Sequence, residues 1–99
     1  MMKISKSLNG TSLTLALEGR LDTLTAPELE KELDECMKDV NELTLDLSAL
    51  EYISSAGLRA LLSEHKKMSR KGGMKVTNVN ELVSEVFEVT GFSEILTIE

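Results

Sequence analysis

Apolar and polar positions alternate over residues 43–48, where leucine occupies every second position. A period of two is typical of a strand that buries one face, so we expect a buried strand that ends at Ser48. Residues 4–8 and 13–17 are also predicted as strands, and they flank Asn9-Gly10. Both residues of this dipeptide tolerate positive φ, which favours a tight hairpin turn.

Beyond residue 54 the spacing becomes helical. Apolar residues recur three or four positions apart from Leu58 to Met68, which predicts a helix with one apolar face. Similar spacing occurs over residues 29–40 and again over residues 82–87. We therefore expect three amphipathic helices in the chain.

The limits of these helices are marked by capping and stop residues. Thr25-Ala26-Pro27-Glu28 fits a capping box, with proline tolerated in the first helical turn. Gly72-Gly73 is predicted to end the second helix, and Asn80 to cap the third, which should stop at Gly91.

The order of elements predicts the fold class. Residues 74–79 are expected to form another strand, and the tail at residues 95–98 either a short strand or a docked extension. Helices that intervene between later strands favour parallel neighbours, while the opening hairpin adds an antiparallel pair. The prediction is an α/β fold, with a mixed, mostly parallel sheet of about four to five strands packed against about three to four helices. Residues 1–99 should form one domain.

Composition limits the functions that the chain can have. It has 99 residues, of which 41% are hydrophobic, enough for a single small core. The net charge is −6, whereas domains that bind nucleic acid through its phosphates are usually basic. One cysteine cannot form an internal disulfide, and no apolar run approaches the roughly 20 residues of a membrane span. We expect a cytoplasmic protein without direct contact with nucleic acid or membrane.

Two serines, Ser54 and Ser55, stand where the second helix is predicted to begin. A hydroxyl there lies near free backbone N–H groups and the positive end of the helix dipole. By spacing alone, either serine can be a simple N-cap, which stabilises a helix by about 1 kcal/mol. Gly57 costs about 1 kcal/mol relative to alanine inside a helix. Close approach by a partner or by neighbouring backbone is the expected reason for this glycine.

The sequence around these serines resembles the signature of the STAS domain family, in particular the bacterial anti-sigma factor antagonists. The matching elements are Asp46-Leu47-Ser48, the pair Tyr52-Ile53, the loop Ser54–Leu58 and the leucine-rich helix behind it. A second match lies upstream, in Leu17–Asp22 followed by Thr25–Glu28. The resemblance covers nearly the whole chain and implies a compact STAS-like α/β domain.

The resemblance also implies a function. In this family the serine two places before the glycine, here Ser55, is phosphorylated by the anti-sigma factor, which is itself a serine kinase. The unmodified domain binds that kinase and releases a sigma factor, and a separate serine phosphatase restores the unmodified form. The domain itself is expected to have no catalytic residue, cofactor or metal. The partner-binding residues that the resemblance implies are Asp22, Ser54, Ser55, Ala56, Gly57, Leu58 and Arg59.

Two positions depart from the family pattern. Antagonists commonly have aspartate before the phosphorylated serine, where this chain has Ser54. They often have serine or threonine after it, where this chain has Ala56. The first change removes a carboxylate that bears on recognition by the kinase and adds a competing hydroxyl, whereas the second removes a competitor.

Other functions are weighed against this one. The main alternative is a STAS-type interaction scaffold without phosphoregulation, in a sensory or lipid-transport complex. A hydrolase that uses Ser55 lacks a base, because His65, the only histidine, lies roughly 15 Å away along the same predicted helix. Cys36 has no second cysteine with which to form a redox or zinc site and is expected to be a small buried hydrophobe. An enzyme is therefore not expected.

Overall fold

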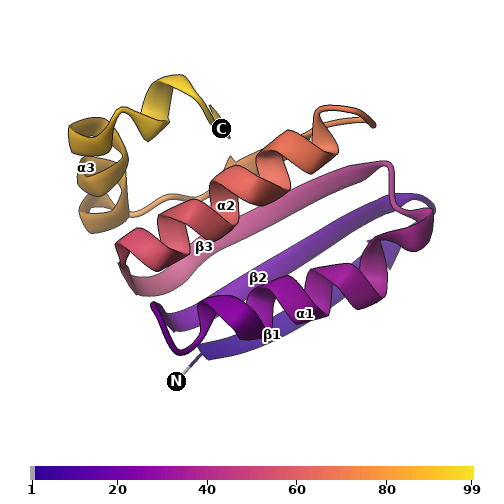
Figure 1. Ribbon diagram of the computed structural model, residues 1–99, viewed down its shortest axis with the longest axis horizontal. Helices are drawn as coiled ribbons and strands as arrows, with labels where there is room; N and C mark the ends of the chain where they lie inside the picture. Colours follow the sequence, from indigo (N-terminus) through magenta and orange to yellow (C-terminus); the bar gives the residue numbers. More distant parts are fainter. Residues whose placement is uncertain (1) are drawn as a thin grey trace.

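A five-stranded sheet with strand order β1-β2-β3-β4-β5 organises the fold (Figure 1). The computed structural model describes residues 2–99, apart from the side chains of residues 36 and 37. β1 and β2 form the predicted antiparallel hairpin, and every other neighbouring pair is parallel. The predicted mixed, mostly parallel sheet is thus confirmed. The strands are β1 (Met2–Asn9), β2 (Ser12–Leu21), β3 (Glu42–Ile53), β4 (Met74–Thr77) and β5 (Thr97–Ile98).

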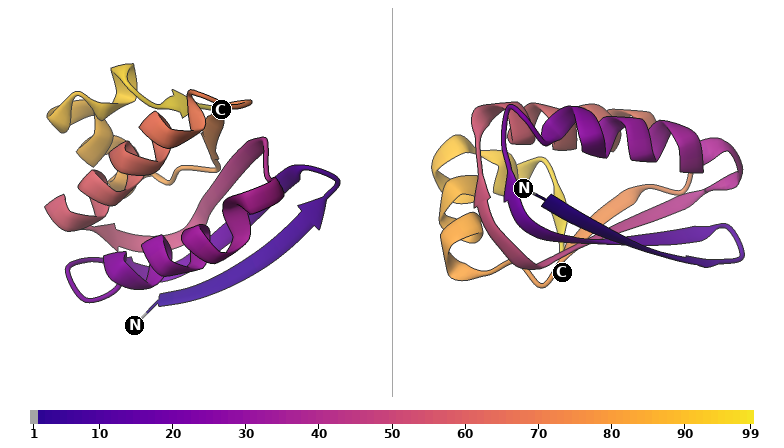
Figure 2. Two further views of the ribbon diagram at one scale, coloured as in Figure 1. Left: turned by 45° about the vertical axis from the view of Figure 1, so that its right-hand side comes forward. Right: turned by 90° about the horizontal axis from the view of Figure 1, so that it is seen from below.

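Two of the helices, α1 and α2, lie along one face of the sheet, while α3 lies at the end where α2 begins (Figures 1 and 2). In the described part of the chain no helix covers the opposite face of the sheet, as the right-hand view of Figure 2 shows. The helices are α1 (Ala26–Cys36), α2 (Ser55–Met68) and α3 (Glu81–Thr90), with the short 3-10 helices η1 (Met37–Asp39) and η2 (Phe92–Glu94).

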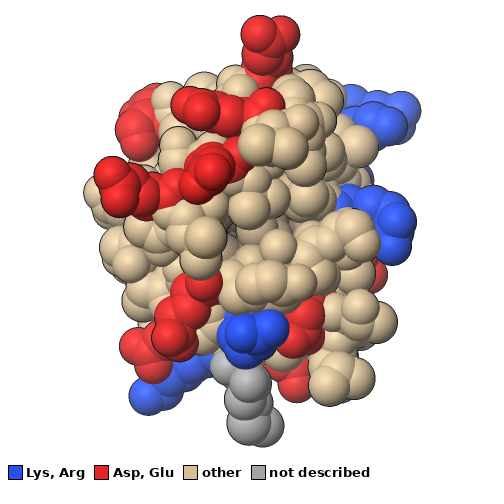
Figure 3. All heavy atoms as spheres, turned by 90° about the vertical axis from the view of Figure 1, so that its left-hand side faces the viewer, with Lys and Arg blue, Asp and Glu red and all other residues tan. Residues whose placement is uncertain are grey.

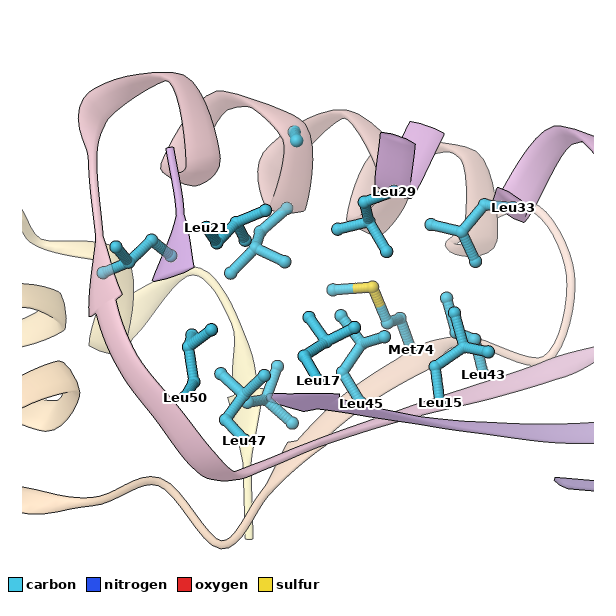
Figure 4. Packing of buried hydrophobic residues seen from close by; sticks show 14 of the residues in the cluster. Leu15, Leu17, Leu21, Leu29, Leu33, Leu43, Leu45, Leu47, Leu50 and Met74 are labelled. Carbon is cyan, nitrogen blue, oxygen red and sulfur yellow. The ribbon is translucent and has the colours of Figure 1, made fainter. Parts of the chain in front are cut away.

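The core lies between the sheet and the helices and is mainly aliphatic. Leu15 and Leu17 of β2 and Leu45 of β3 point toward Leu29 and Leu33 of α1, and all five side chains are fully buried (Figure 4). Because successive side chains of a strand point to opposite faces, Ala16 of β2 and Thr44 and Asp46 of β3 face the helix-free side. The alternation over residues 43–48 therefore predicted the core face of β3 correctly.

β3 continues to Ile53, well beyond the predicted end at Ser48. The parallel pairing with β2 shifts register twice between Ala16 and Arg20, and each shift adds an unpaired residue to β3. Such bulges break the alternation of buried and exposed positions, although the strand itself goes on. The predicted end of this strand was wrong because a period of two cannot detect a bulged strand.

The end of β4 and the capping of α1 also differ from the predictions. β4 ends at Thr77, before the predicted end at residue 79, because Asn78 has a left-handed φ of 55° that interrupts the strand. The Thr25 hydroxyl does not form the predicted capping box. It accepts a bond from the Asp22 N–H at 2.8 Å and donates one to the Arg20 carbonyl at 2.7 Å.

The end of α2 and the chain tail complete the fold. α2 ends at Met68, four residues before the predicted stop at Gly72-Gly73, and the N–H groups of Lys71 and Gly73 both bond to the Met68 carbonyl. Of the two alternatives for the tail, the strand is correct, since Thr97 and Ile98 pair with β4. None of the described helices has the length and apolar character needed to cross a membrane.

Candidate functional site

The candidate site lies where β2 and β3 end side by side. Leu21 and Ile53 are partners in the parallel register, and the Ser54 N–H donates to the Leu21 carbonyl at 2.9 Å. Parallel neighbours end at the same edge of a sheet, so the loop after β2 and the start of α2 become neighbours. This brings Asp22 beside the serines, although the two segments are far apart in the sequence.

Ser54 is the N-cap of α2. Its backbone is extended, with φ −98° and ψ 177°, and its Oγ accepts a hydrogen bond from the Gly57 N–H at 3.3 Å. Ser55 is the first residue of the helix, and its side chain is exposed to solvent. Within the described residues no hydrogen bond holds the Ser55 hydroxyl. The two serines therefore have different environments, which the spacing of the sequence could not decide.

Gly57 allows α2 to begin close to the end of β2. A Cβ atom at this position would lie 2.8 Å from the Leu21 carbonyl oxygen and 2.9 Å from Ile53 Cγ1. Both distances are shorter than real Cβ contacts, so a larger side chain has to displace the helix or its neighbours. Close approach by neighbouring backbone, one of the two reasons expected for this glycine, is thus present.

The other residues of this turn differ in exposure. Leu58 is buried in the core, and Gly57 is buried against β2, so both support the surface from beneath. Ala56 is half-buried, whereas Arg59 is exposed one helical turn after Ser55. A partner that approaches the start of α2 meets Ser55 and Arg59 before it meets Leu58.

Asp22 holds the loop between β2 and α1 in shape. Its Oδ1 accepts hydrogen bonds from the backbone N–H groups of Leu24 at 3.0 Å and Thr25 at 3.1 Å. Partial desolvation raises the pKa of the Asp22 carboxyl, but these bonds and the nearby Arg20 charge outweigh it, so the pKa lies below its usual value. Asp22 Oδ2 lies 3.8 Å from Arg20 Nε. The Asp22 carboxylate thus bonds mainly to residues of its own loop.

The same loop presents a leucine that sequence analysis did not single out. The side chain of Leu24 is 83% exposed, and it lines a cavity of about 290 Å³ together with Asp22, Thr25 and Glu28. Leu24 lies between a strand and a helix and belongs to neither apolar pattern. Only a mismatch between its apolar side chain and its loop position could have indicated it from the sequence.

Charge is unevenly distributed over this end of the molecule. Figure 3 shows an uncharged centre, with acidic side chains gathered over the upper part of the view, where α3 lies. At the ends of β2 and β3, the Arg20 guanidinium lies 4.2 Å from the centroid of the Tyr52 ring, a cation–π contact between paired residues. This end of the molecule thus has an acidic surface over α3 beside an uncharged area.

The other residues considered as candidates lie elsewhere or form no cluster. His65 lines a cavity of about 400 Å³ toward the opposite end of α2, together with Ser69, Lys75 and Glu99. No group of three or more metal-ligating side chains occurs among the described residues. The prediction for Cys36 falls on a side chain outside the described part of the structure. The cavity near His65 is therefore separate from Ser54 and Ser55.

Comparison with known proteins gives the family of the chain. The family model of the STAS domain matches residues 3–99. BtrV of Bordetella bronchiseptica, a candidate anti-sigma factor antagonist, is 34% identical over 98% of this chain and 85% of its own length.

Solved structures have the same fold. An anti-sigma factor antagonist from Mycobacterium paratuberculosis has a TM-score of 0.89 at 23% identity, over 99% of this chain and 85% of that chain. The Bacillus cell fate determinant SpoIIAA, solved in a phosphorylated form, has a TM-score of 0.76 at 14% identity, over 98% of this chain and 91% of its own.

The fold and the match over residues 3–99 define a STAS domain, and the chain belongs to the STAS domain family. Its similarity to BtrV groups it with the anti-sigma factor antagonists within that family, as the resemblance of the sequence implied. Proteins of this class are regulatory binding proteins and not enzymes.

Proposed function

We propose that this protein is a cytoplasmic anti-sigma factor antagonist that binds an anti-sigma factor serine kinase and is switched off by phosphorylation on Ser55. Residues 1–99 act as one STAS domain. Binding of the unmodified protein to the kinase releases a sigma factor, and a serine phosphatase returns the phosphorylated form to the unmodified one. The protein requires no cofactor and contacts neither nucleic acid nor membrane.

The observation that carries this proposal is the difference between the two serines. A kinase needs an accessible hydroxyl, and the exposed Ser55 side chain offers one at the first position of α2. The Ser54 oxygen is half-buried and is used as the cap of the same helix. Phosphorylation of Ser54 would remove the cap, whereas phosphorylation of Ser55 leaves it in place.

A phosphate on Ser55 is compatible with the fold. It adds about −1.5 to −2 charges at the N-terminus of α2, where negative charge is favourable by roughly 0.3–1 kcal/mol. The Arg59 side chain, one turn along the exposed face, adds a cation within reach. SpoIIAA, which has the same fold, exists in a phosphorylated form. The switch therefore acts at the surface and needs no refolding.

The same phosphate is unfavourable for a partner that covers Ser55. A 100-fold loss of affinity corresponds to about 2.7 kcal/mol, which desolvation and like-charge repulsion at a close interface can supply. The proposed partner surface includes Ser55, Ser54, Ala56 and Arg59 at the start of α2. Asp22 contributes through the loop that it shapes, while Gly57 and Leu58 position the helix from within.

The proposed transfer step is a phosphoryl transfer from ATP. The Ser55 oxygen attacks the γ-phosphorus, the bond between that phosphorus and the β–γ bridging oxygen breaks, and ADP leaves. The proton of the Ser55 hydroxyl passes to a base of the kinase. In the reverse step the phosphatase hydrolyses the phosphoserine. The bond between phosphorus and Ser55 Oγ breaks, and water supplies one oxygen of the inorganic phosphate and the proton of the restored hydroxyl.

The experiment that tests this function is mass spectrometry of the protein isolated from its native cells, in growing and in stressed cultures. The intact mass and fragments across residues 43–71 show whether one phosphate is present and which serine carries it. A phosphate on Ser55, lost in Ser55→Ala and kept in Ser54→Ala, supports the proposal. Absence of phosphate in all conditions contradicts it and favours the scaffold without phosphoregulation.

Binding is tested separately, with an anti-sigma factor serine kinase from the same organism. The unmodified protein should bind this kinase, and the phosphorylated protein should bind at least about 100-fold more weakly. Equal binding of both forms would contradict the switch while leaving the antagonist function intact. Lack of binding by either form would contradict the antagonist function itself.

A further inference from the structure

Helix α3 has two apolar sides, only one of which is covered. Val83 and Phe87 are fully buried in the core. On the outside, Leu82 and Val89 are 54% and 81% exposed. Val86 between them is half-buried and packs in part against the core. A surface helix needs one apolar side to attach it to its own domain. A second one at the surface is typical of an interaction site. We refer to Leu82, Val86 and Val89 as the outer stripe.

The outer stripe has the residue spacing of a helix-binding surface. Its residues are spaced four and then three positions apart, so they form one row along the helix. Leu82, Val86 and Val89 line a cavity of about 330 Å³ together with Glu85 and Thr90. Amphipathic helices bind apolar protein surfaces through residues with the same spacing.

Both ends of α3 are capped, so the outer stripe is formed before a partner binds. Asn80 caps the helix by accepting a bond from the Val83 N–H at 2.9 Å, and its side-chain amide donates to the Leu50 carbonyl of β3 at 2.6 Å. Gly91 ends the helix in a left-handed conformation, with φ 82°. A preformed surface binds at a lower cost in conformational entropy than one that must first be ordered.

The charges around the outer stripe restrict what can cover it. α3 contains Glu81, Glu85 and Glu88 but no lysine or arginine. Figure 3 shows acidic side chains gathered over this part of the surface. Anionic lipids and nucleic acid are repelled by such a surface. A second copy that packs α3 against α3 would bring the carboxylates of both copies together, which is unfavourable for the same reason.

We propose that the outer stripe of α3 binds a basic amphipathic helix of a partner protein. The apolar face of that helix packs against Leu82, Val86 and Val89, and its lysine or arginine side chains lie beside Glu85 and Glu88. The proposal does not depend on phosphorylation of Ser55, although α3 lies at the same end of the molecule as the start of α2 (Figures 1 and 2). A partner bound at Ser55 can therefore reach both surfaces.

The test is an NMR titration of the whole protein with a short helical peptide that carries leucine on one face and lysine on the other. We expect shifts of backbone amide signals confined to residues 81–90 and their neighbours. A peptide with the same leucine pattern and glutamate in place of lysine should bind at least about tenfold more weakly.

Two variants test the residues of the surface. Leu82→Ser with Val89→Ser should weaken binding of the lysine peptide at least about tenfold. The matched control, Leu8→Ser, removes an exposed leucine on β1 and should leave binding unchanged. Glu85→Lys keeps the outer stripe and should reduce the preference for the lysine peptide. It tests the proposal even if the double serine variant does not fold.

Four outcomes would overturn the proposal. The first is equal binding of both peptides, and the second is peptide binding that the variants on α3 leave unchanged. The third is a concentration-dependent shift of α3 signals without peptide, which would identify a second copy as the occupant. The fourth is binding of the protein through α3 to phosphatidylglycerol vesicles, which would identify a membrane. Phosphorylation of Ser55 is measured independently, so failure here leaves the proposed function untouched.

Discussion

The Ser54 N–H donates a hydrogen bond to the Leu21 carbonyl at 2.9 Å, and this single contact joins the start of α2 to the end of β2. The same carbonyl lies against Gly57, at the position that the Cβ of any other residue would occupy. One backbone group thus sets both the position of the N-cap and the path of the first helical turn. It also places the Asp22 loop next to the exposed Ser55.

The two serines should respond differently to removal of their hydroxyls. Ser54→Ala removes the cap of α2 and should lower the free energy of unfolding by about 1 kcal/mol. Ser55→Ala should leave stability nearly unchanged, because its side chain is exposed and caps nothing. Urea denaturation of both variants measures the difference. A larger loss in Ser55→Ala than in Ser54→Ala would contradict the assignment of the cap.

Gly57→Ala should destabilise the protein despite the better helix propensity of alanine. Propensity favours alanine by about 1 kcal/mol, but overpacking against the Leu21 carbonyl and Ile53 costs about 1–3 kcal/mol. The expected net effect is a loss of up to about 2 kcal/mol, measured by urea denaturation. Arg59→Ala, at an exposed position of the same helix, is the control and should be close to neutral. A gain of stability in Gly57→Ala would show that the helix moves away without cost.

The Asp22 carboxylate should make stability depend on pH. Its folded-state pKa is depressed, so its contribution is present above the unfolded value of about 3.9 and is lost as the pH falls through the lower folded-state value. Asp22→Asn should therefore be less stable than the wild type at neutral pH, and the difference should shrink below about pH 4. Urea midpoints measured across this range test the sign.

Glu51→Gln, an exposed carboxylate on β3, controls for the loss of one negative charge. A difference between wild type and Asp22→Asn that stays constant down to low pH would show that the loop needs the shape of the side chain and not its charge.

Arg59 should stabilise the dianionic phosphate once Ser55 is phosphorylated. The second pKa of a phosphoserine is about 6, and a cation one helical turn away lowers it. Arg59→Ala should therefore raise the pKa of that phosphate, which titration by phosphorus NMR measures directly. Lys66→Ala, further along α2, is the control for loss of one positive charge and should have a smaller effect. Identical titration midpoints in Arg59→Ala and the wild type would exclude contact between the two groups.

Local patterns in the sequence predicted most of the fold. The alternating leucines of residues 43–48, the Asn9-Gly10 turn and the helical spacing from Leu58 to Met68 depend only on near neighbours in the chain. For that reason the element order, the parallel sheet and the core faces were correct. The serine pair was also placed correctly at the start of a helix, because capping is a property of adjacent residues.

The sequence by itself thus determined the elements, their order and the position of the serines at a helix start. Only the tertiary structure decided the length of β3, the choice of Ser54 as the cap, the contact of Gly57 with Leu21 and the neighbouring position of Asp22. These features depend on the register between β2 and β3, whose bulges arise from pairing across the sheet. Periodicity along one segment carries no information about such a register, because the partners are distant in the chain.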